Sequence, residues 1–319
     1  MNVNELNNML EQIKNPVVGK ALITTFSKLN NCGYKKVLCS VSGGSDSDVV
    51  IDLVSKCDNH NIVDYVYFDT GLEYQATKEH IEYLKEKYNI NIEIIRPKIP
   101  IPLSCKRYGQ PFLNKHVSEM MNRLQRHDFK WEDKTFDELY KEYPRCKSAL
   151  EWWCNTKPSP SHNIKQNKLL KEFIIANPPN FLISQLCCKY AKKDLLHEKM
   201  KEGYDLDISG VRKAEGGVRA NAYKSCFDNK DNYDRFRPIF WFSDDDKSYY
   251  RKLYNVSNSK CYSQYGLKRT GCCGCPFGRE FEQELQIINK FEPKFYKAVN
   301  NIFKDSYEYT RKYKEFKSL

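Results

Sequence analysis

Residues 42–47, Ser-Gly-Gly-Ser-Asp-Ser, have the composition of a loop that binds phosphate. They follow an apolar run at 37–41 and lead directly into a helical pattern at 46–57. A helix that begins at such a loop presents free backbone N–H groups and the positive end of its dipole to an anion. Gly43 and Gly44 allow the backbone to pass close to phosphate. The spacing differs from a Walker A loop, which has four residues between its glycines, and it favours a pyrophosphate site.

A second candidate group, Asp69-Thr70-Gly71, stands at the end of another apolar run, residues 63–68. A carboxylate at the carboxyl end of a strand, beside a phosphate site, can hold Mg²⁺ or a ribose hydroxyl. Taken alone, the tripeptide equally describes a turn.

The segment 210–219 contains two arginines, Arg212 and Arg219, with Glu215 between them. Arginine suits phosphate or sulfate because its planar guanidinium group binds in a bidentate manner and keeps its charge. An ion-paired surface with no ligand is the alternative interpretation.

Cysteine forms the fourth candidate group. Cys187 and Cys188 are adjacent, and Cys272 and Cys275 form a C-x-x-C pair. Four thiolates can bind zinc or an iron–sulfur cluster, and adjacent ligands suit a cluster, whose ligands are spread over several iron atoms, better than one tetrahedral zinc ion. Cys273 is an extra thiol, available as an alternative ligand or as a sulfur carrier.

These groups need alternating strands and helices to position them. Apolar runs at 37–41, 63–68 and 90–95 are separated by helical patterns at 46–57 and 73–88. The alternation predicts an α/β, Rossmann-like parallel sheet with helices on both faces and a site at the carboxyl ends of the strands.

Changes in pattern divide the chain into four expected parts. An N-terminal helical stretch runs to about residue 29, the sheet resumes near 204–208, and a further segment begins at Arg237. The expected parts are a nucleotide-binding core at 1–103, a mainly helical insertion or lid at 104–165, a second part of the core with the arginine segment and the cysteines at 166–278, and C-terminal helices at 279–319.

Several side chains are expected in cores rather than in the site. Trp152 and Trp153 are predicted to be buried because tryptophan usually is. The cysteines predicted to act as small apolar side chains are Cys32, Cys39 and Cys57. Cys105, which follows the third strand, could face the site.

The composition narrows the cellular setting. The chain has 319 residues, 13 cysteines and a net charge of +11, which is compatible with a polyanionic partner as well as with an ordinary basic surface. We expect a cytoplasmic protein with no membrane segment, because no apolar run of about 18 residues and no basic-then-apolar leader occur. Cysteines in that compartment indicate metal or sulfur chemistry rather than disulfides.

Together these motifs resemble a known family. The loop at 42–47 resembles the S-G-G-x-D-S signature of the PP-loop ATP pyrophosphatases, the adenine nucleotide alpha hydrolase-like superfamily. The D-T-G segment and 210–219 resemble motifs of its phosphoadenosine phosphosulfate reductase branch, with Gly216 where the family usually has serine. The cysteines resemble the [4Fe-4S] ligands of adenylyl-sulfate reductases, with Ala191 in place of an arginine of that flank.

The resemblance implies three sets of residues. They are, for the nucleotide, Ser42, Gly43, Gly44, Ser45, Asp46, Ser47, Asp69, Thr70, Gly71, Arg212 and Glu215; for catalysis, Asp46, Arg212, Arg219 and Cys273; and for the [4Fe-4S] cluster, Cys187, Cys188, Cys272 and Cys275.

The expected activity is that of an enzyme that splits ATP into AMP and pyrophosphate, adenylates a target and then transfers sulfur to it. The intact loop favours this over a reductase, as does the absence of cysteine after Cys275. ATP and Mg²⁺ are the implied cofactors beside the cluster, with zinc as the alternative metal. DNA or tRNA is the expected target, a cysteine desulfurase could supply sulfur, and a homodimer is conceivable. The alternative is a thiol-dependent adenylyl-sulfate or phosphoadenylyl-sulfate reductase whose attacking cysteine is Cys105 or Cys273.

Overall fold

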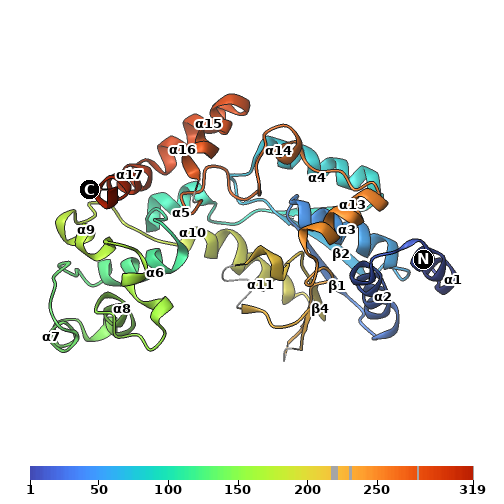
Figure 1. Cartoon of the computed structure of the whole chain (residues 1–319), viewed down its shortest axis with the longest axis horizontal. Coiled ribbons are helices and arrows are strands. Elements are labelled where there is room, and N and C mark those ends of the chain that lie inside the picture. The colour runs from blue at the N-terminus through green and yellow to red at the C-terminus, as the bar shows by residue number, and fades with distance from the viewer. Residues whose placement is uncertain (217–221, 230–231, 279, 319) are drawn as a thin grey trace. The chain divides into compact units, whose positions relative to one another are not determined.

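The apolar runs become neighbouring strands of one sheet in the computed structural model, which describes residues 1–216, 222–229, 232–278 and 280–318. The strand order is β3-β2-β1-β4-β6-β5 (Figure 1). All neighbours pair parallel except β5 and β6, which are antiparallel. This confirms the predicted α/β fold with a parallel sheet. The strands are β1 (Val37–Val41), β2 (Val63–Phe68), β3 (Ile92–Ile95), β4 (Leu206–Ile208), β5 (Phe227–Asp228) and β6 (Asp234–Phe236).

The sheet belongs to the first of two compact units, which comprises Met1–Pro97 and Lys192–Gly271. Consecutive parallel strands such as β1 and β2 are joined by a helix that returns the chain to the end of the sheet at which the first strand began, as parallel pairing requires. The helices of this unit are α1 (Val3–Gln12), α2 (Pro16–Asn31), α3 (Ser45–Cys57), α4 (Gln75–Tyr88), α11 (Asp194–Met200), α13 (Asp244–Leu253) and α14 (Lys260–Ser263), with the 3₁₀ turn η5 (Lys213–Glu215).

Helices cover both faces of the sheet, as the sequence predicts. Alternate residues of a strand point to opposite faces. Cys39 of β1 lies in a core with the apolar faces of α2 and α3. Its neighbour Leu38 packs with Val66 of β2 and with Met200 of α11 in a separate cluster.

Two local features differ from the sequence-based expectation. The N-terminal helical stretch consists of two helices, α1 and α2. Asn15 is the N-cap of α2, and its side chain accepts hydrogen bonds from the N–H groups of Val17 and Val18, so a new helix begins after it. β6 ends before Arg237, the position at which the sequence predicts that a further segment begins. Pro238 has no N–H to donate to a strand ladder, which is consistent with that end.

The second compact unit comprises Lys98–Ala191 and Cys272–Leu319 and is helical. It therefore contains parts of the segment 166–278 that the sequence groups with the core. Its helices are α5 (Ile101–Tyr108), α6 (Lys115–Gln125), α7 (Phe136–Glu142), α8 (Lys147–Trp153), α9 (Leu170–Ala176), α10 (Leu186–Cys188), α15 (Phe281–Phe291), α16 (Pro293–Ile302) and α17 (Lys304–Ser318); 3₁₀ turns occur at η1 (Pro144–Cys146), η2 (Pro160–His162) and η3 (Ile164–Gln166), and a π-helical turn, η4 (Lys189–Lys193), follows α10.

This helical unit has its own aromatic core. Trp152 and Trp153 are fully buried in it, as predicted. Phe112 lies 4.8 Å from Tyr309 between ring centroids, so α17 packs against the segment that leads into α6. The C-terminal helices thus complete the core of the insertion.

The core predictions for cysteine are correct at two of three positions. Cys39 and Cys57 are buried, but Cys32 is exposed. Cys32 is the C-cap of α2, one residue beyond the helix, whereas the last buried side chain of α2 is Leu29. Across the described part of the chain, no helix combines the length and the apolar character needed to cross a membrane.

Gly109 offers a test of this packing. Its φ is 104°, and a Cβ there would lie 2.3 Å from the carbonyl oxygen of Leu182. We expect Gly109→Ala to lower the free energy of unfolding by about 3 kcal/mol or more, because backbone strain and a clash add. Gly203→Ala is the control, since Gly203 has a φ of 89° but nothing within 4 Å, and should lose only about 1–2 kcal/mol. Urea denaturation measures both; equal losses would contradict the clash.

Candidate functional site

The turn between β1 and α3 leaves the start of the helix open to an anion. Gly44 is the N-cap of α3 and has no side chain with which to cap the helix. Gly43 has a φ of 64°, a left-handed conformation that glycine adopts readily. The Ser42 hydroxyl accepts from the Gly44 N–H at 3.3 Å, and the Ser47 hydroxyl accepts from the Ser42 N–H at 3.0 Å. The serines therefore hold the turn, while the uncapped helix end keeps its positive potential.

Two glycines allow neighbouring elements to approach this turn closely. A Cβ at Gly43 would lie 2.9 Å from Thr77 Cγ2 of α4. A Cβ at Gly210, which follows β4, would lie 3.2 Å from the carbonyl carbon of Asp46 and 3.2 Å from the nitrogen of Ser47. The glycine that opens the segment 210–219 is thus needed because the chain after β4 lies directly against the first turn of α3.

Two hydroxyl groups cover the turn, and the sequence alone does not point to them. The Tyr262 hydroxyl of α14 accepts from the Ser45 N–H at 3.2 Å and from the Thr270 N–H at 3.2 Å. The Thr270 hydroxyl oxygen would lie 3.2 Å from a Cβ at Gly44. One N–H at the start of α3 therefore already has an acceptor, with which a phosphate oxygen would compete.

Arg212 is anchored to the loop by Asp46. Arg212 Nε donates to Asp46 Oδ1 at 2.9 Å, and Lys247 Nζ of α13 lies 2.9 Å from the same oxygen. The other guanidinium nitrogens donate to the Phe242 carbonyl at 3.2 Å and to Asp244 at 2.9 Å. The Arg212 side chain is only 5% exposed. In this structure the guanidinium N–H groups of Arg212 therefore donate to acceptors of the protein itself.

These contacts keep Asp46 ionised. Burial opposes its ionisation, but the hydrogen bond from Lys247 and the charges of Lys247 and Arg212 outweigh burial and lower the pKa of Asp46 below its ordinary value. A hydrogen bond with Glu215, on η5, acts in the same direction. Lys247 was missed at the sequence level, because only the fold brings α13 to the β1–α3 turn.

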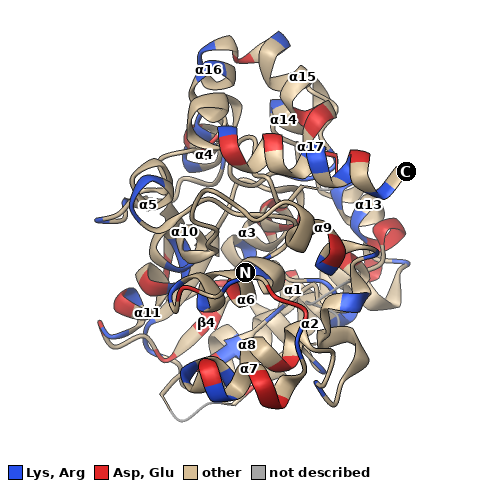
Figure 2. Cartoon of the chain, turned by 90° about the vertical axis from the view of Figure 1, so that its left-hand side faces the viewer, with Lys and Arg blue, Asp and Glu red and all other residues tan. Residues whose placement is uncertain are grey.

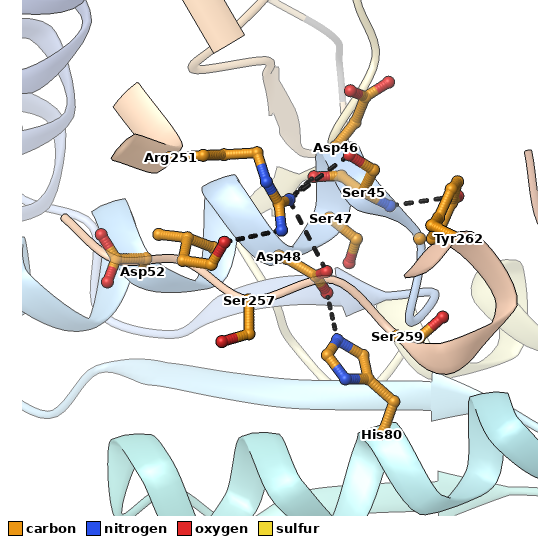
Figure 3. A network of polar contacts seen from close by, with 12 residues as sticks. Ser45, Asp46, Ser47, Asp48, Asp52, His80, Arg251, Ser257, Ser259 and Tyr262 are labelled. Atoms are coloured by element: carbon orange, nitrogen blue, oxygen red, sulfur yellow. Dashed lines mark hydrogen bonds and ion pairs between the residues drawn. The ribbon is translucent and has the colours of Figure 1, made fainter. Parts of the chain in front are cut away.

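A second carboxylate of α3, Asp48, is completely buried (Figure 3). His80 Nε2 of α4 lies 3.0 Å from Asp48 Oδ1, and Arg251 Nη1 of α13 lies 3.9 Å from Oδ2. Arg251 also donates to the Ser45 carbonyl at 3.1 Å. Figure 3 shows His80 and Arg251 reaching Asp48 from opposite sides. Burial raises the pKa of Asp48, and these two partners counteract that rise. No local pattern in the sequence indicated this network.

The D-T-G segment lies at the carboxyl end of β2, the strand beside β1. Asp69 accepts from the Gly71 N–H at 3.0 Å and from Arg96 Nε at 3.2 Å. The Thr70 hydroxyl donates to Glu73 at 2.7 Å. Asp69 and Thr70 are both buried, so their side chains shape this turn. A role for Asp69 toward Mg²⁺ or ribose stays a prediction.

Arg219, the second arginine of the segment 210–219, lies outside the residues that the structure describes.

All the cysteines of the predicted cluster belong to the helical unit. A hydrogen bond with Cys105 is the main cause that raises the pKa of Cys187, and the charge of Cys275 adds to it. Burial, followed by the charges of Cys272 and Cys188, raises the pKa of Cys275. The fold therefore brings the Cys187–Cys188 pair into electrostatic contact with Cys275. Within the described residues, however, no three His, Cys, Asp or Glu side chains are arranged to hold one metal ion.

The extra thiol is less accessible than a sulfur carrier would be. Cys273 is 0% exposed, and Cys105 is 5% exposed. The turn that holds Cys273 is fixed by Gly274, which has a φ of 64° and whose carbonyl accepts from the Tyr307 hydroxyl. Any reaction at Cys273 would require this turn to open.

Comparison with known proteins adds family relationships. Residues 36–277 match the phosphoadenosine phosphosulfate reductase domain family. The chain is 23% identical to adenosine 5′-phosphosulfate reductase 2 of Bacillus subtilis (strain 168), over 76% of this chain and 72% of that protein.

Two solved structures are similar at low sequence identity. A phosphoadenylyl-sulfate reductase from Candida auris is 12% identical with a TM-score of 0.44, over 85% of this chain and 96% of that one. The U34-tRNA thiolase from Methanococcus maripaludis, solved with its [4Fe-4S] cluster, is 14% identical with a TM-score of 0.40, over 93% of this chain and 80% of that one. The family relationship rests on the match of residues 36–277.

The position of Tyr262 predicts how the turn responds to an anion. We expect Tyr262→Phe to bind inorganic pyrophosphate about two- to tenfold more tightly, because the ring is kept while the acceptor that competes for the Ser45 N–H is removed. Isothermal titration calorimetry measures the affinity. Tyr83→Phe is the control, since the Tyr83 hydroxyl donates to Ser257 at 3.3 Å on the exposed side of α4. Weaker binding by Tyr262→Phe would instead make this hydroxyl part of the anion site.

Proposed function

This chain belongs to the phosphoadenosine phosphosulfate reductase family, and from that premise we propose that it is an ATP pyrophosphatase-type enzyme that adenylates a nucleic acid for sulfur transfer. The observation that carries the proposal is the uncapped start of α3 behind an intact Ser-Gly-Gly-Ser-Asp-Ser turn. A site for an already adenylated substrate has no need for a turn that receives a leaving pyrophosphate.

The proposed reaction has two steps. An oxygen of the nucleic acid attacks the α-phosphorus of ATP, the bond from that phosphorus to the bridging oxygen breaks, and pyrophosphate leaves with the electron pair. A sulfide nucleophile, supplied directly or released from a cysteine desulfurase persulfide by a thiol reductant, then displaces AMP from the activated atom. Backbone N–H groups of 43–47 stabilise the charge that develops on the departing pyrophosphate.

The charged residues around the turn have distinct proposed roles. Asp46 and Asp69 supply the carboxylates that Mg²⁺ prefers beside phosphate oxygens, and that ion would neutralise charge on the nucleotide. Arg212 and Lys247 both contact Asp46, so either cation can move from this carboxylate to a phosphate oxygen over a short distance. Arg219 is proposed to assist at the α-phosphate.

The thiols of the helical unit are proposed to hold a [4Fe-4S] cluster, with zinc as the alternative. The ligands would be Cys187, Cys188, Cys272 and Cys275, whose mutual electrostatic contacts are compatible with a shared group. When bound, such a cluster supplies sulfur or electron-transfer chemistry. Whether the acceptor is DNA or tRNA, and whether the enzyme is a homodimer, are open parts of the same proposal.

A second candidate function is a thiol-dependent adenylyl-sulfate or phosphoadenylyl-sulfate reductase. The match to the Bacillus subtilis reductase favours it. The attacking thiols available to it would be Cys105 and Cys273, and both are buried. Because a nucleophilic cysteine needs access to its substrate, this favours the first candidate.

Pyrophosphate release from ATP separates the two. We expect the unaltered chain to release pyrophosphate with nucleic acid and Mg²⁺ present, and Asp46→Ala to reduce the rate by about a hundredfold or more, because the variant loses the carboxylate proposed to hold Mg²⁺ and the anchor of Arg212. Asp245→Ala is the control, because Asp245 is an exposed carboxylate on α13. Sulfite release from adenylyl sulfate without ATP would support the reductase, and inactivity in both assays would reject both functions.

Metal analysis tests the cysteine assignment. We expect anaerobically purified protein to contain iron and acid-labile sulfide and to show the broad visible absorption of an iron–sulfur centre, and Cys187→Ser to lose these signals. Cys154→Ser is the control, since the Cys154 thiol donates to the Lys134 carbonyl at 3.8 Å in the same unit. A colourless protein with stoichiometric zinc would overturn the cluster assignment.

A further inference from the structure

The helical unit contains a small basic pocket that the proposed chemistry does not use. The pocket has a volume of about 130 Å³ and lies where the end of α6 meets η1 and the start of α8. Among the described residues, no carboxylate lines it. Its charged and polar lining residues are Arg123, Arg126, His127, Arg145 and Ser148.

The arginines of this pocket are incompletely neutralised. Arg123 forms an ion pair with Glu119, one turn earlier on α6. Within the part of the chain that the structure describes, neither Arg126 nor Arg145 contacts a carboxylate. Cations near the end of α6 also balance the helix dipole, which accounts for Arg123 and Arg126 but not for Arg145, because Arg145 belongs to η1. Three guanidinium groups around one cavity repel one another unless an anion lies between them.

Ser148 adds a directed donor to the pocket. Its hydroxyl oxygen accepts from Lys157 Nζ at 2.7 Å, so its own proton stays available to an anion. The Lys157 charge is balanced by Glu151 at 3.0 Å. The pocket therefore combines guanidinium donors with a hydroxyl group, which matches the oxygens of a phosphate group.

The residues that follow along the chain line a second and larger cavity, of about 400 Å³. Phe129 and Trp131 are in its lining, and their rings meet edge to face at 5.5 Å between centroids. Both rings are buried in the aromatic core of this unit, so the larger cavity offers no exposed ring on which a base could stack, and the basic pocket alone presents groups to a polyanion. Figure 2 shows Lys and Arg mixed with Asp and Glu over the helices of this unit, so the pocket is a local grouping rather than part of one basic face.

We propose that this pocket, at the junction of α6 and α8, binds a backbone phosphate of the nucleic-acid acceptor. The inference rests on the proposed function, because that function supplies the polyanion. The pocket would hold the acceptor by its phosphodiester chain and not by its sequence, since arginine contacts to phosphate carry no base information. The insertion at 104–165 would then have a role in substrate binding.

The test compares a double variant, Arg126→Gln with Arg145→Gln, to the unaltered full chain. Fluorescence anisotropy would measure binding of a labelled single-stranded DNA oligonucleotide and of a labelled tRNA at several salt concentrations. We expect the double variant to bind the preferred polymer about tenfold more weakly at moderate salt. The slope of log affinity against log salt should decrease by about 1 for each phosphate that the variant no longer neutralises.

A matched control removes two charges elsewhere in the same unit. Lys141 and Lys168 are exposed and line neither cavity, so Lys141→Gln with Lys168→Gln should change affinity less than about twofold. Circular dichroism melting checks that both double variants are folded. Equal losses in the two double variants, or no loss in either, would overturn the proposal, as would strong competition by inorganic phosphate at low millimolar concentration, because the pocket would then be a small-anion site.

The choice of polymer distinguishes DNA from tRNA as the source of the phosphate. Pyrophosphate release by the unaltered chain is measured in parallel. If that activity is absent, the proposed function fails, whereas the binding comparison still decides whether the pocket holds a phosphodiester chain.

Discussion

The candidate site depends on one packing constraint, the close approach of two chain segments to the turn that begins α3. Gly43 lies against α4, and Gly210 brings the chain after β4 to the backbone of Asp46 and Ser47. A side chain at either glycine would push the turn away from its neighbours. Since the N–H groups of this turn are the proposed anion ligands, their position is set by packing that involves no ligand at all.

The same turn carries two acidic residues, which by themselves would repel a phosphate. The structure offsets both. Arg212 and Lys247 meet Asp46, while His80 and Arg251 meet the buried Asp48. With their charges balanced in this way, the positive end of α3 can still attract an anion. The partners of both carboxylates come from elements distant in sequence, so the electrostatics of the loop belong to the unit as a whole.

The candidate cluster cysteines belong to the helical unit, whereas the turn at 42–47 belongs to the unit with the sheet. Its cysteines meet through α5, α10 and the turn at 272–275, and its core closes only when the C-terminal helices pack against the insertion. The insertion is therefore a structural support for the cysteine segments as well as the carrier of the basic pocket. The basic pocket lies entirely within the expected insertion at 104–165, whereas the core of this unit combines residues from three of the expected parts.

The sequence by itself determined the parallel sheet, the turn at 42–47 and the pairing of cysteines as a candidate group, because these signals are local: apolar alternation, glycine conformation and short spacings. It also predicted the burial of Trp152 and Trp153, but it placed the exposed Cys32 in a core. Only the tertiary structure decided the partners of Asp46 and Asp48, the hydroxyl of Tyr262 over the turn and the basic pocket. Those contacts join residues up to about two hundred positions apart, and no local pattern encodes which helix face will meet which strand end.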